Sequence, residues 1–118
     1  MLIFKKYFFD AAHYLSDLGD NQNYKKMHGH SYEVTITLSG EVNQDKNWVM
    51  DLERLDKLTK PVISLLDHST LNDVVGLEKP TSENIAKWLW LNLKKKVPNL
   101  VRVEVNRPRI GGCIYSGE

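Results

Sequence analysis

Four histidines are the residues best suited to chemistry in this sequence, and two of them are separated by a single glycine. His28 and His30 stand in the segment HGHSY, and His13 ends the segment FDAAH. If a strand begins near His28, its period of two places both imidazoles on one face. With a third imidazole from a neighbouring strand, they match a three-histidine zinc site that keeps an open fourth position, as catalytic zinc sites do.

The histidine pattern has a second interpretation. An HxH motif often arises by chance, and these are then ordinary polar histidines at the start of a strand. Spacing alone does not decide between the two. His68 presents a similar choice, because it follows Asp67 in LLDHSTLND. A carboxylate can orient an imidazole for acid–base catalysis. A histidine at the negative end of a helix is also stabilised without any catalytic role, and this simpler interpretation is preferred for the local pattern.

The strands that must position these residues can be predicted from side-chain patterning. Apolar and polar residues alternate without a break from Ser31 to Val42. Such alternation predicts a strand with one buried face and one wet face. The polar segment from Ser16 to Asn23 predicts a loop. The other expected strands are Leu2 to about Asp10, Val101 to Val105, and Cys113 to Tyr115, with Gly111 and Gly112 in the last turn.

Two helices are expected between the second and third strands. Asp51 is a good N-cap and precedes leucines at helical spacing, a pattern that Pro61 should kink or restart. A second helix should begin at Thr81 or Ser82 and end before Pro98. The order of elements predicts an α+β fold, a four-stranded antiparallel sheet with two helices. One sheet face and two edges stay open in this arrangement, which favours oligomerisation.

Composition narrows the class of protein. The 118 residues fit one domain, with 42% hydrophobic and 26% charged residues. Sixteen basic against fifteen acidic residues give a net charge of +1, which argues against nucleic acid and anionic membranes as partners. A single cysteine, Cys113, excludes an intrachain disulfide and is interpreted as a small core residue. Without an apolar run of membrane length or a visible signal peptide, a cytoplasmic protein is expected.

Several motifs together carry a resemblance to one family. FDAAH, HGHSYEV, MDLERL, LDHSTLN, PTSEN and GGCIYSGE follow the order and spacing of the 6-pyruvoyl-tetrahydropterin synthase family. The short chain and its CIYSGE ending are most similar to the bacterial branch, the 6-carboxytetrahydropterin synthases. The resemblance covers residues 1–118 and implies a single domain with the tunnelling fold, or T-fold. Subunits of that fold join their antiparallel sheets into barrels, typically as hexamers built from trimers, with active sites between subunits.

The resemblance also implies an activity and a set of site residues. Family members act on dihydroneopterin triphosphate. The bacterial branch makes 6-carboxytetrahydropterin, releasing triphosphate and acetaldehyde, on the route to 7-deazaguanines and queuosine. Zinc in this family makes protons of the substrate's side chain easier to remove. The matching positions here are His13, His28 and His30 for zinc, Asp67 and His68 for the acid–base pair, and Thr81 and Ser82 for the pterin.

Two positions depart from the family pattern. Tyr24 stands where the family has its catalytic cysteine, and a tyrosine with a reference pKa near 10 is a poor base at neutral pH. Arg107 stands where the family has a glutamate that accepts the N–H groups of the pterin, but a guanidinium only donates. Arg107 could bind a carboxylate or phosphate of the substrate instead. A solvated charge in a basic turn with Arg109 is the preferred interpretation.

Three hypotheses about function follow from these departures. The first is an active synthase whose base is Tyr24, His68, or Asp17 or Asp20 of the polar loop. The second is a divergent zinc enzyme that performs retro-aldol cleavage or epimerisation on another pterin-like substrate. The third is a non-catalytic relative that binds pterin or zinc. Retention of the histidines and of Asp67 favours an enzyme, so the synthase activity is the prediction.

Overall fold

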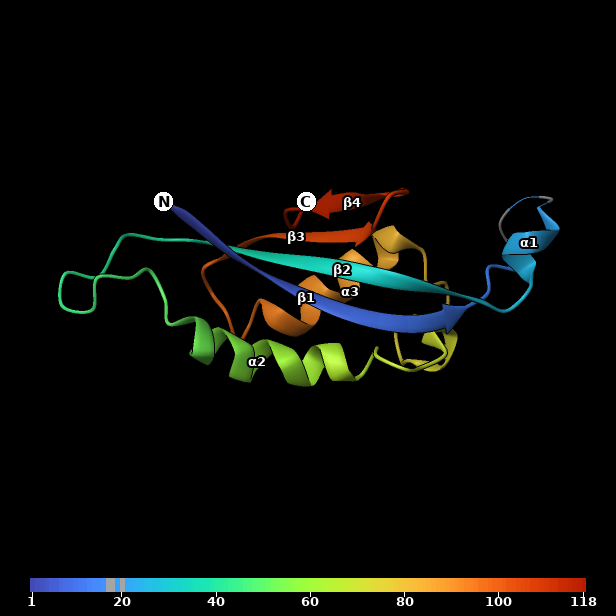
Figure 1. Ribbon diagram of the computed structural model, residues 1–118, viewed down its shortest axis with the longest axis horizontal. Coiled ribbons are helices and arrows are strands. Elements are labelled where there is room, and N and C mark those ends of the chain that lie inside the picture. The colour runs from blue at the N-terminus through green and yellow to red at the C-terminus, as the bar shows by residue number, and fades with distance from the viewer. Residues whose placement is uncertain (17–18, 20) are drawn as a thin grey trace.

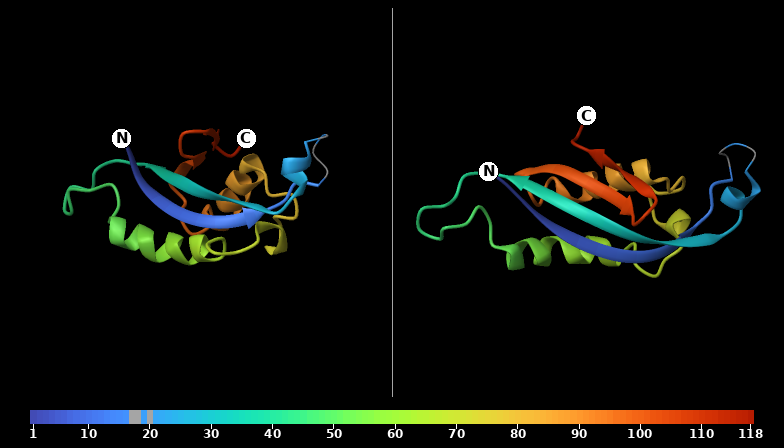
Figure 2. Two further views of the ribbon diagram at one scale, coloured as in Figure 1. Left: turned by 45° about the vertical axis from the view of Figure 1, so that its right-hand side comes forward. Right: turned by 45° about the horizontal axis from the view of Figure 1, so that its top comes forward.

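A curved antiparallel sheet carries two helices on one of its faces (Figures 1 and 2). The computed structural model describes residues 1–16, 19 and 21–118. The strands lie in the sheet in chain order: β1 (Leu2–His13), β2 (His28–Ser39), β3 (Leu100–Arg107) and β4 (Gly111–Tyr115). The helices are α1 (Gln22–Lys25), α2 (Leu52–Ser64) and α3 (Ser82–Leu93), with a 3₁₀ turn, η1, at Leu71–Asp73. The predicted four-stranded sheet and its two main helices are confirmed.

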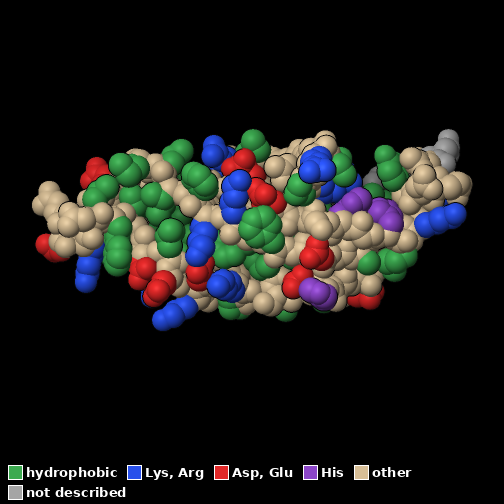
Figure 3. All heavy atoms as spheres, viewed as in Figure 1, with side chains coloured by type: hydrophobic (Ala, Val, Ile, Leu, Met, Phe, Trp, Pro, Cys, Tyr) green, Lys and Arg blue, Asp and Glu red, His purple; other side chains and the backbone are tan. Residues whose placement is uncertain are grey.

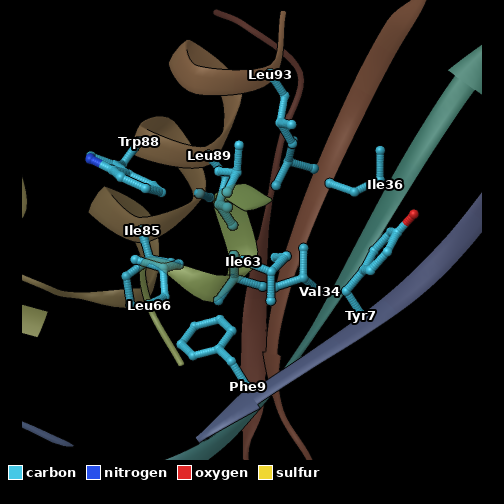
Figure 4. Close-up of a cluster of buried hydrophobic side chains, with 14 of the residues drawn as sticks. Tyr7, Phe9, Val34, Ile36, Ile63, Leu66, Ile85, Trp88, Leu89 and Leu93 are labelled. Atoms are coloured by element: carbon cyan, nitrogen blue, oxygen red, sulfur yellow. The ribbon is translucent and has the colours of Figure 1, made fainter. Parts of the chain in front are cut away.

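The core lies between the sheet and helices α2 and α3. Tyr7 and Phe9 of β1 and Val34 and Ile36 of β2 point toward these helices (Figure 4). Their helical partners are Ile63 of α2, Leu66 just beyond it, and Ile85, Trp88, Leu89 and Leu93 of α3. The opposite sheet face is open, and hydrophobic side chains lie among charged ones on it (Figure 3). Phe4 and Phe8 of β1 are among the exposed hydrophobic residues. The alternation therefore identified the buried face of β2.

Both main helices begin at the predicted caps. The Asp51 carboxylate accepts a hydrogen bond from the Glu53 N–H at 3.0 Å, and the Thr81 hydroxyl accepts one from the Asn84 N–H at 3.2 Å. Pro61 lies inside α2, which continues to Ser64, so the expected restart of the helix is wrong. None of the helices in the described residues is long and apolar enough to cross a bilayer.

Strand pairing corrects the predicted ends of the first two strands. β1 continues past Asp10 to His13 because residues 11–13 pair with residues 28–30 of β2. For the same reason β2 begins at His28, three residues before Ser31. It ends at Ser39 because its partner there is Leu2, the first residue of β1. A strand ends where its pairing with a neighbouring strand ends, and a sequence pattern does not reveal that pairing.

The last turn and the first loop also differ from expectation. Gly111 and Gly112 are paired residues of β4, and the turn is formed by residues 108–110. Gly112 is required for packing, since a Cβ there would lie 2.2 Å from the Val105 carbonyl oxygen. The predicted loop from Ser16 to Asn23 contains the start of α1. Asp17 and Asp20 lie outside the described residues.

Candidate functional site

Three imidazoles meet where β1 ends and β2 begins. The register pairs His13 with His28 across the two strands and places His30 opposite Ala11. One nitrogen from each ring lies within 4.8 Å of the others, and among the described residues they are the one such group. His13 is buried, whereas His28 and His30 are half-buried. The predicted histidine trio is thus assembled by a strand pairing that no single motif contains.

Two backbone carbonyls fix which nitrogens of this trio are available. Nδ1 of His13 lies 2.8 Å from the Pro80 carbonyl oxygen, and Nδ1 of His28 lies 2.7 Å from that of Lys26. A carbonyl only accepts, so each Nδ1 must carry the hydrogen and donate it. In the neutral rings both Nε2 atoms then present lone pairs, and these atoms are 3.0 Å apart.

The two facing Nε2 atoms of His13 and His28 are arranged as ligands of one metal ion would be. Facing lone pairs repel unless a proton or a cation lies between them. Two imidazole nitrogens bound to tetrahedral zinc would be about 3.3 Å apart, close to the separation seen here. Metal-binding histidines usually donate their other N–H to a carbonyl or carboxylate, as His13 and His28 do here. The donor set therefore fits a divalent metal with a preference for nitrogen ligands.

Burial keeps two of these rings neutral at physiological pH. It lowers the pKa of His13, and it combines with the neighbouring His13 and Arg107 to lower the pKa of His30 to about 4. A metal binds the neutral imidazole and must otherwise displace a proton. Both rings are therefore already in the form that binds a metal.

A cavity of about 740 Å³ opens beside the trio. It brings together three other groups that the sequence analysis selected: Tyr24 of α1, the Thr81–Ser82 segment at the start of α3, and Arg107 at the end of β3. Tyr24 is about half exposed (48%) at the cavity rim. Residues from five elements, β1, α1, β2, α3 and β3, thus line one space of the size of a small-molecule site.

Arg107 is not the solvated charge that was preferred from the sequence. Its Nη1 lies 3.4 Å from Nε2 of His30, and its Nε is buried without a hydrogen-bond partner. Arg109, two residues on, is exposed with a positive φ of 69°. The two arginines of this turn therefore differ, and only Arg107 lines the cavity.

Asp67 and His68 do not line the cavity with the trio. The Asp67 carboxylate accepts the Asp10 N–H at 3.0 Å and lies 3.0 Å from Nδ1 of His68. The hydrogen bond from the Asp10 N–H and, to a smaller extent, the contact with His68 lower the pKa of Asp67. The His68 side chain is 82% exposed and borders a second groove, which shares only His30 with the trio. Histidine side chains accordingly reach the surface at two separate places in Figure 3.

The sequence analysis missed two charged residues of the cavity. Glu83 and Lys26 line it beside the predicted residues. Glu83 follows Ser82 directly, and its adjacency to this predicted binding segment was the available indication that it lies in the cavity. Lys26 carries the carbonyl that orients His28. The position of Lys26 two residues before His28 was the available indication that it lies near the cavity.

Comparison with known proteins agrees with this geometry. The family model described as 6-pyruvoyl tetrahydropterin synthase matches residues 2–118. The chain belongs to this family. A family relative from Synechocystis sp., named 6-carboxy-5,6,7,8-tetrahydropterin synthase, is 36% identical over 110 residues, covering 88% of this chain and 84% of the relative. A relative from Pyrococcus furiosus, named dihydroneopterin monophosphate aldolase, is 33% identical over 96 residues, which cover 81% of this chain and 77% of the relative.

A solved structure of the 6-pyruvoyl tetrahydropterin synthase family confirms the fold. The Caenorhabditis elegans 6-pyruvoyl tetrahydropterin synthase superposes with a TM-score of 0.87 at 27% identity, covering 100% of this chain and 96% of the other. The T-fold expected from the sequence motifs is therefore confirmed. The relatives carry enzyme names, in agreement with the prediction of an enzyme.

Proposed function

We propose that this protein is a zinc-dependent pterin lyase of the 6-carboxytetrahydropterin synthase type. Its substrate would be dihydroneopterin triphosphate, and its product would feed 7-deazaguanine and queuosine synthesis in the cytoplasm. The observation that carries the proposal is the trio of His13, His28 and His30, with two tautomers fixed by carbonyls, at the wall of a cavity. Zinc held there would polarise side-chain oxygens of the substrate and make their protons easier to remove.

Residues at the start of α3 are proposed to hold the pterin ring. Thr81 and Ser82 line the cavity with polar atoms, and Glu83 is its one carboxylate among the described lining residues. A carboxylate can accept the ring N–H groups. Glu83 therefore offers the acceptor that Arg107, which only donates, cannot provide at its own position.

The catalytic base is proposed to be Tyr24 within the same chain. It lies on α1, whose carbonyl at Tyr24 accepts the Leu15 N–H, so the short helix is tied to the chain that leaves β1. Tyr24 lines the cavity that contains the trio. A bound cation would favour the phenolate and so strengthen this base. Asp17 and Asp20 remain the alternatives to be tested by substitution.

The Asp67–His68 pair is proposed to serve the cavity of a neighbouring copy. Its place outside the trio's cavity and the exposure of His68 support this arrangement. β4 and the first part of β1 lie at the edges of the sheet, whereas the end of β1 is covered by residues 68–70. These edges and the exposed Phe4 and Phe8 support assembly through sheets. We propose a homo-oligomeric barrel, a hexamer built from trimers, in which each site combines residues of two chains.

The activity is tested by product analysis. Zinc-loaded protein is incubated with dihydroneopterin triphosphate, and products are identified by mass spectrometry, with His28→Ala as control. Formation of 6-carboxytetrahydropterin and acetaldehyde by the wild-type protein alone supports the synthase. No product from zinc-loaded protein, beside an active relative, contradicts it. Recovery of unchanged bound pterin would then favour a non-catalytic binding protein.

The shared site is tested by mixing inactive variants. His28→Ala removes a trio residue, and His68→Ala removes the exposed member of the acid–base pair. If each site uses both chains, co-refolded mixtures regain part of the activity because some sites receive two intact contributions. Mixtures as inactive as either variant would contradict sharing.

A second candidate function is cleavage of a phosphorylated pterin by retro-aldol chemistry. The observation that favours it is the 33% identity to a relative named dihydroneopterin monophosphate aldolase, together with the replacement at Tyr24 and Arg107. Retro-aldol cleavage would break a carbon–carbon bond of the side chain and release an aldehyde fragment that carries the phosphate. Running the same assay with dihydroneopterin monophosphate separates the two functions.

A further inference from the structure

Arg107 is placed so that its charge faces the histidine trio. The 3.4 Å contact between its Nη1 and Nε2 of His30 puts the guanidinium directly beside the ring nitrogens. Its Nε is buried with no hydrogen-bond partner. Within residues 1–16, 19 and 21–118, no carboxylate lies at ion-pairing distance from it. Because buried donors are normally paired, the unpartnered Nε of Arg107 is a donor that a ligand acceptor in the cavity can fill.

The charges around the cavity favour a negatively charged ligand. Lys26 and Arg107 contribute two positive charges, and Glu83 is the single acid among the described lining residues. A divalent cation on the trio would add to this excess and would repel the guanidinium. An oxygen anion in contact with both the metal and Arg107 removes that repulsion and fills the empty donors.

We propose that Arg107 and the metal site together form a subsite for a carboxylate or phosphate group of the substrate, and that anion binding and metal binding are thermodynamically coupled. The inference rests on the proposed metal site and adds to it the chemistry of the ligand. Without the anion, Arg107 weakens metal binding. With the anion, Arg107 strengthens it. By linkage, metal must strengthen anion binding by the same factor.

The coupling is measured through zinc affinity, with no need for turnover. Zinc is titrated by competition with a chromophoric chelator, alone or with saturating methyl phosphate or acetate, for the wild-type protein and three variants. Arg107→Gln removes the charge, Arg107→Lys keeps it without the planar fork, and Arg109→Gln removes the exposed neighbouring charge as the matched control. Circular dichroism of each metal-free variant checks folding.

Relative to the wild-type protein, Arg107→Gln is expected to bind zinc more tightly without the anion and less tightly with it. Without anion, Arg107→Gln binds zinc more tightly than the wild-type protein. With anion, zinc affinity of the wild-type protein rises roughly tenfold, that of Arg109→Gln rises equally, and that of Arg107→Gln stays unchanged. An effect of methyl phosphate alone assigns a phosphate subsite, and an effect of acetate alone assigns a carboxylate subsite.

Two outcomes would overturn the inference. If zinc binds at one per chain but neither anion changes its affinity, the coupling is wrong while the metal site stands. If no protein binds zinc, the metal site and the inference fall together. The wild-type protein alone also provides a check that needs no variant, because the affinity for the anion must rise by the same factor when zinc is added.

Discussion

Zinc should stabilise the folded protein, and His28→Ala should abolish that effect. A ligand that binds only the folded state at 100 times its dissociation constant adds about 2.7 kcal/mol of stability. For 118 residues, with an unfolding entropy of about 2.1 cal/mol/K per residue, this corresponds to a rise of about 11 °C in Tm. Loss of one ligand that weakens binding a hundredfold would leave less than about 2 °C.

The assay is thermal unfolding followed by circular dichroism, with zinc or with a chelator, at one fixed protein concentration. The quantity compared is the zinc-induced shift of each protein, so that differences in metal-free stability do not enter. His68→Ala is the matched control, because His68 is an exposed histidine outside the trio's cavity, and it should keep the full shift. A full shift in His28→Ala, or its loss in His68→Ala, would refute the assignment of the metal to the trio.

Three further predictions concern the scaffold that holds the site. Tyr7→Phe should lower the free energy of unfolding by about 1.5–3 kcal/mol in urea titrations, because the partly buried Tyr7 hydroxyl donates to the Asp56 carboxylate at 2.7 Å; an unchanged stability would contradict this role. Hydrogen bonds from Lys5 and Tyr7 lower the pKa of Asp56, so its contribution is present above about pH 4, near the unfolded-state pKa, and is lost as pH falls through the lower folded-state pKa. Asp56→Asn should therefore lose less stability than the wild-type protein between pH 5 and 3, and equal losses would count against it. Leu89→Ala, at a fully buried position of α3, should cost about 2–5 kcal/mol, whereas Leu91→Ala, at a position 73% exposed, should change stability by less than about 0.5 kcal/mol; similar losses would contradict the orientation of α3.

Local patterns predicted the parts of the fold that local physics decides. Asp51 and Thr81 cap the helices as expected because an N-cap depends on neighbouring backbone N–H groups. The period of two placed His28 and His30 on one face because side chains alternate along any strand. The true strand ends and the last turn depend on pairing between distant segments. Residues 11–13 became strand only because residues 28–30 lie beside them.

The candidate site was predictable as a set of residues and not as a geometry. Family motifs indicated His13, but its position opposite His28 depends on the register of β1 and β2. Pro80 begins the motif PTSEN. No motif, however, shows that the carbonyls of Pro80 and Lys26 fix the tautomers, because every residue has a carbonyl. The same limit applies to Arg107. Its side chain turns into the cavity while Arg109 stays exposed, a difference that two arginines in one turn do not reveal.

X-ray absorption at the zinc edge of the purified protein tests the central claim most directly. The account predicts one zinc per chain bound by three imidazole nitrogens at about 2.0–2.1 Å, with an oxygen in the fourth position. In His28→Ala the imidazole signal should fall or the metal should be lost. A spectrum with sulfur ligands, or zinc bound equally well after His28→Ala, would contradict a metal centre at His13, His28 and His30.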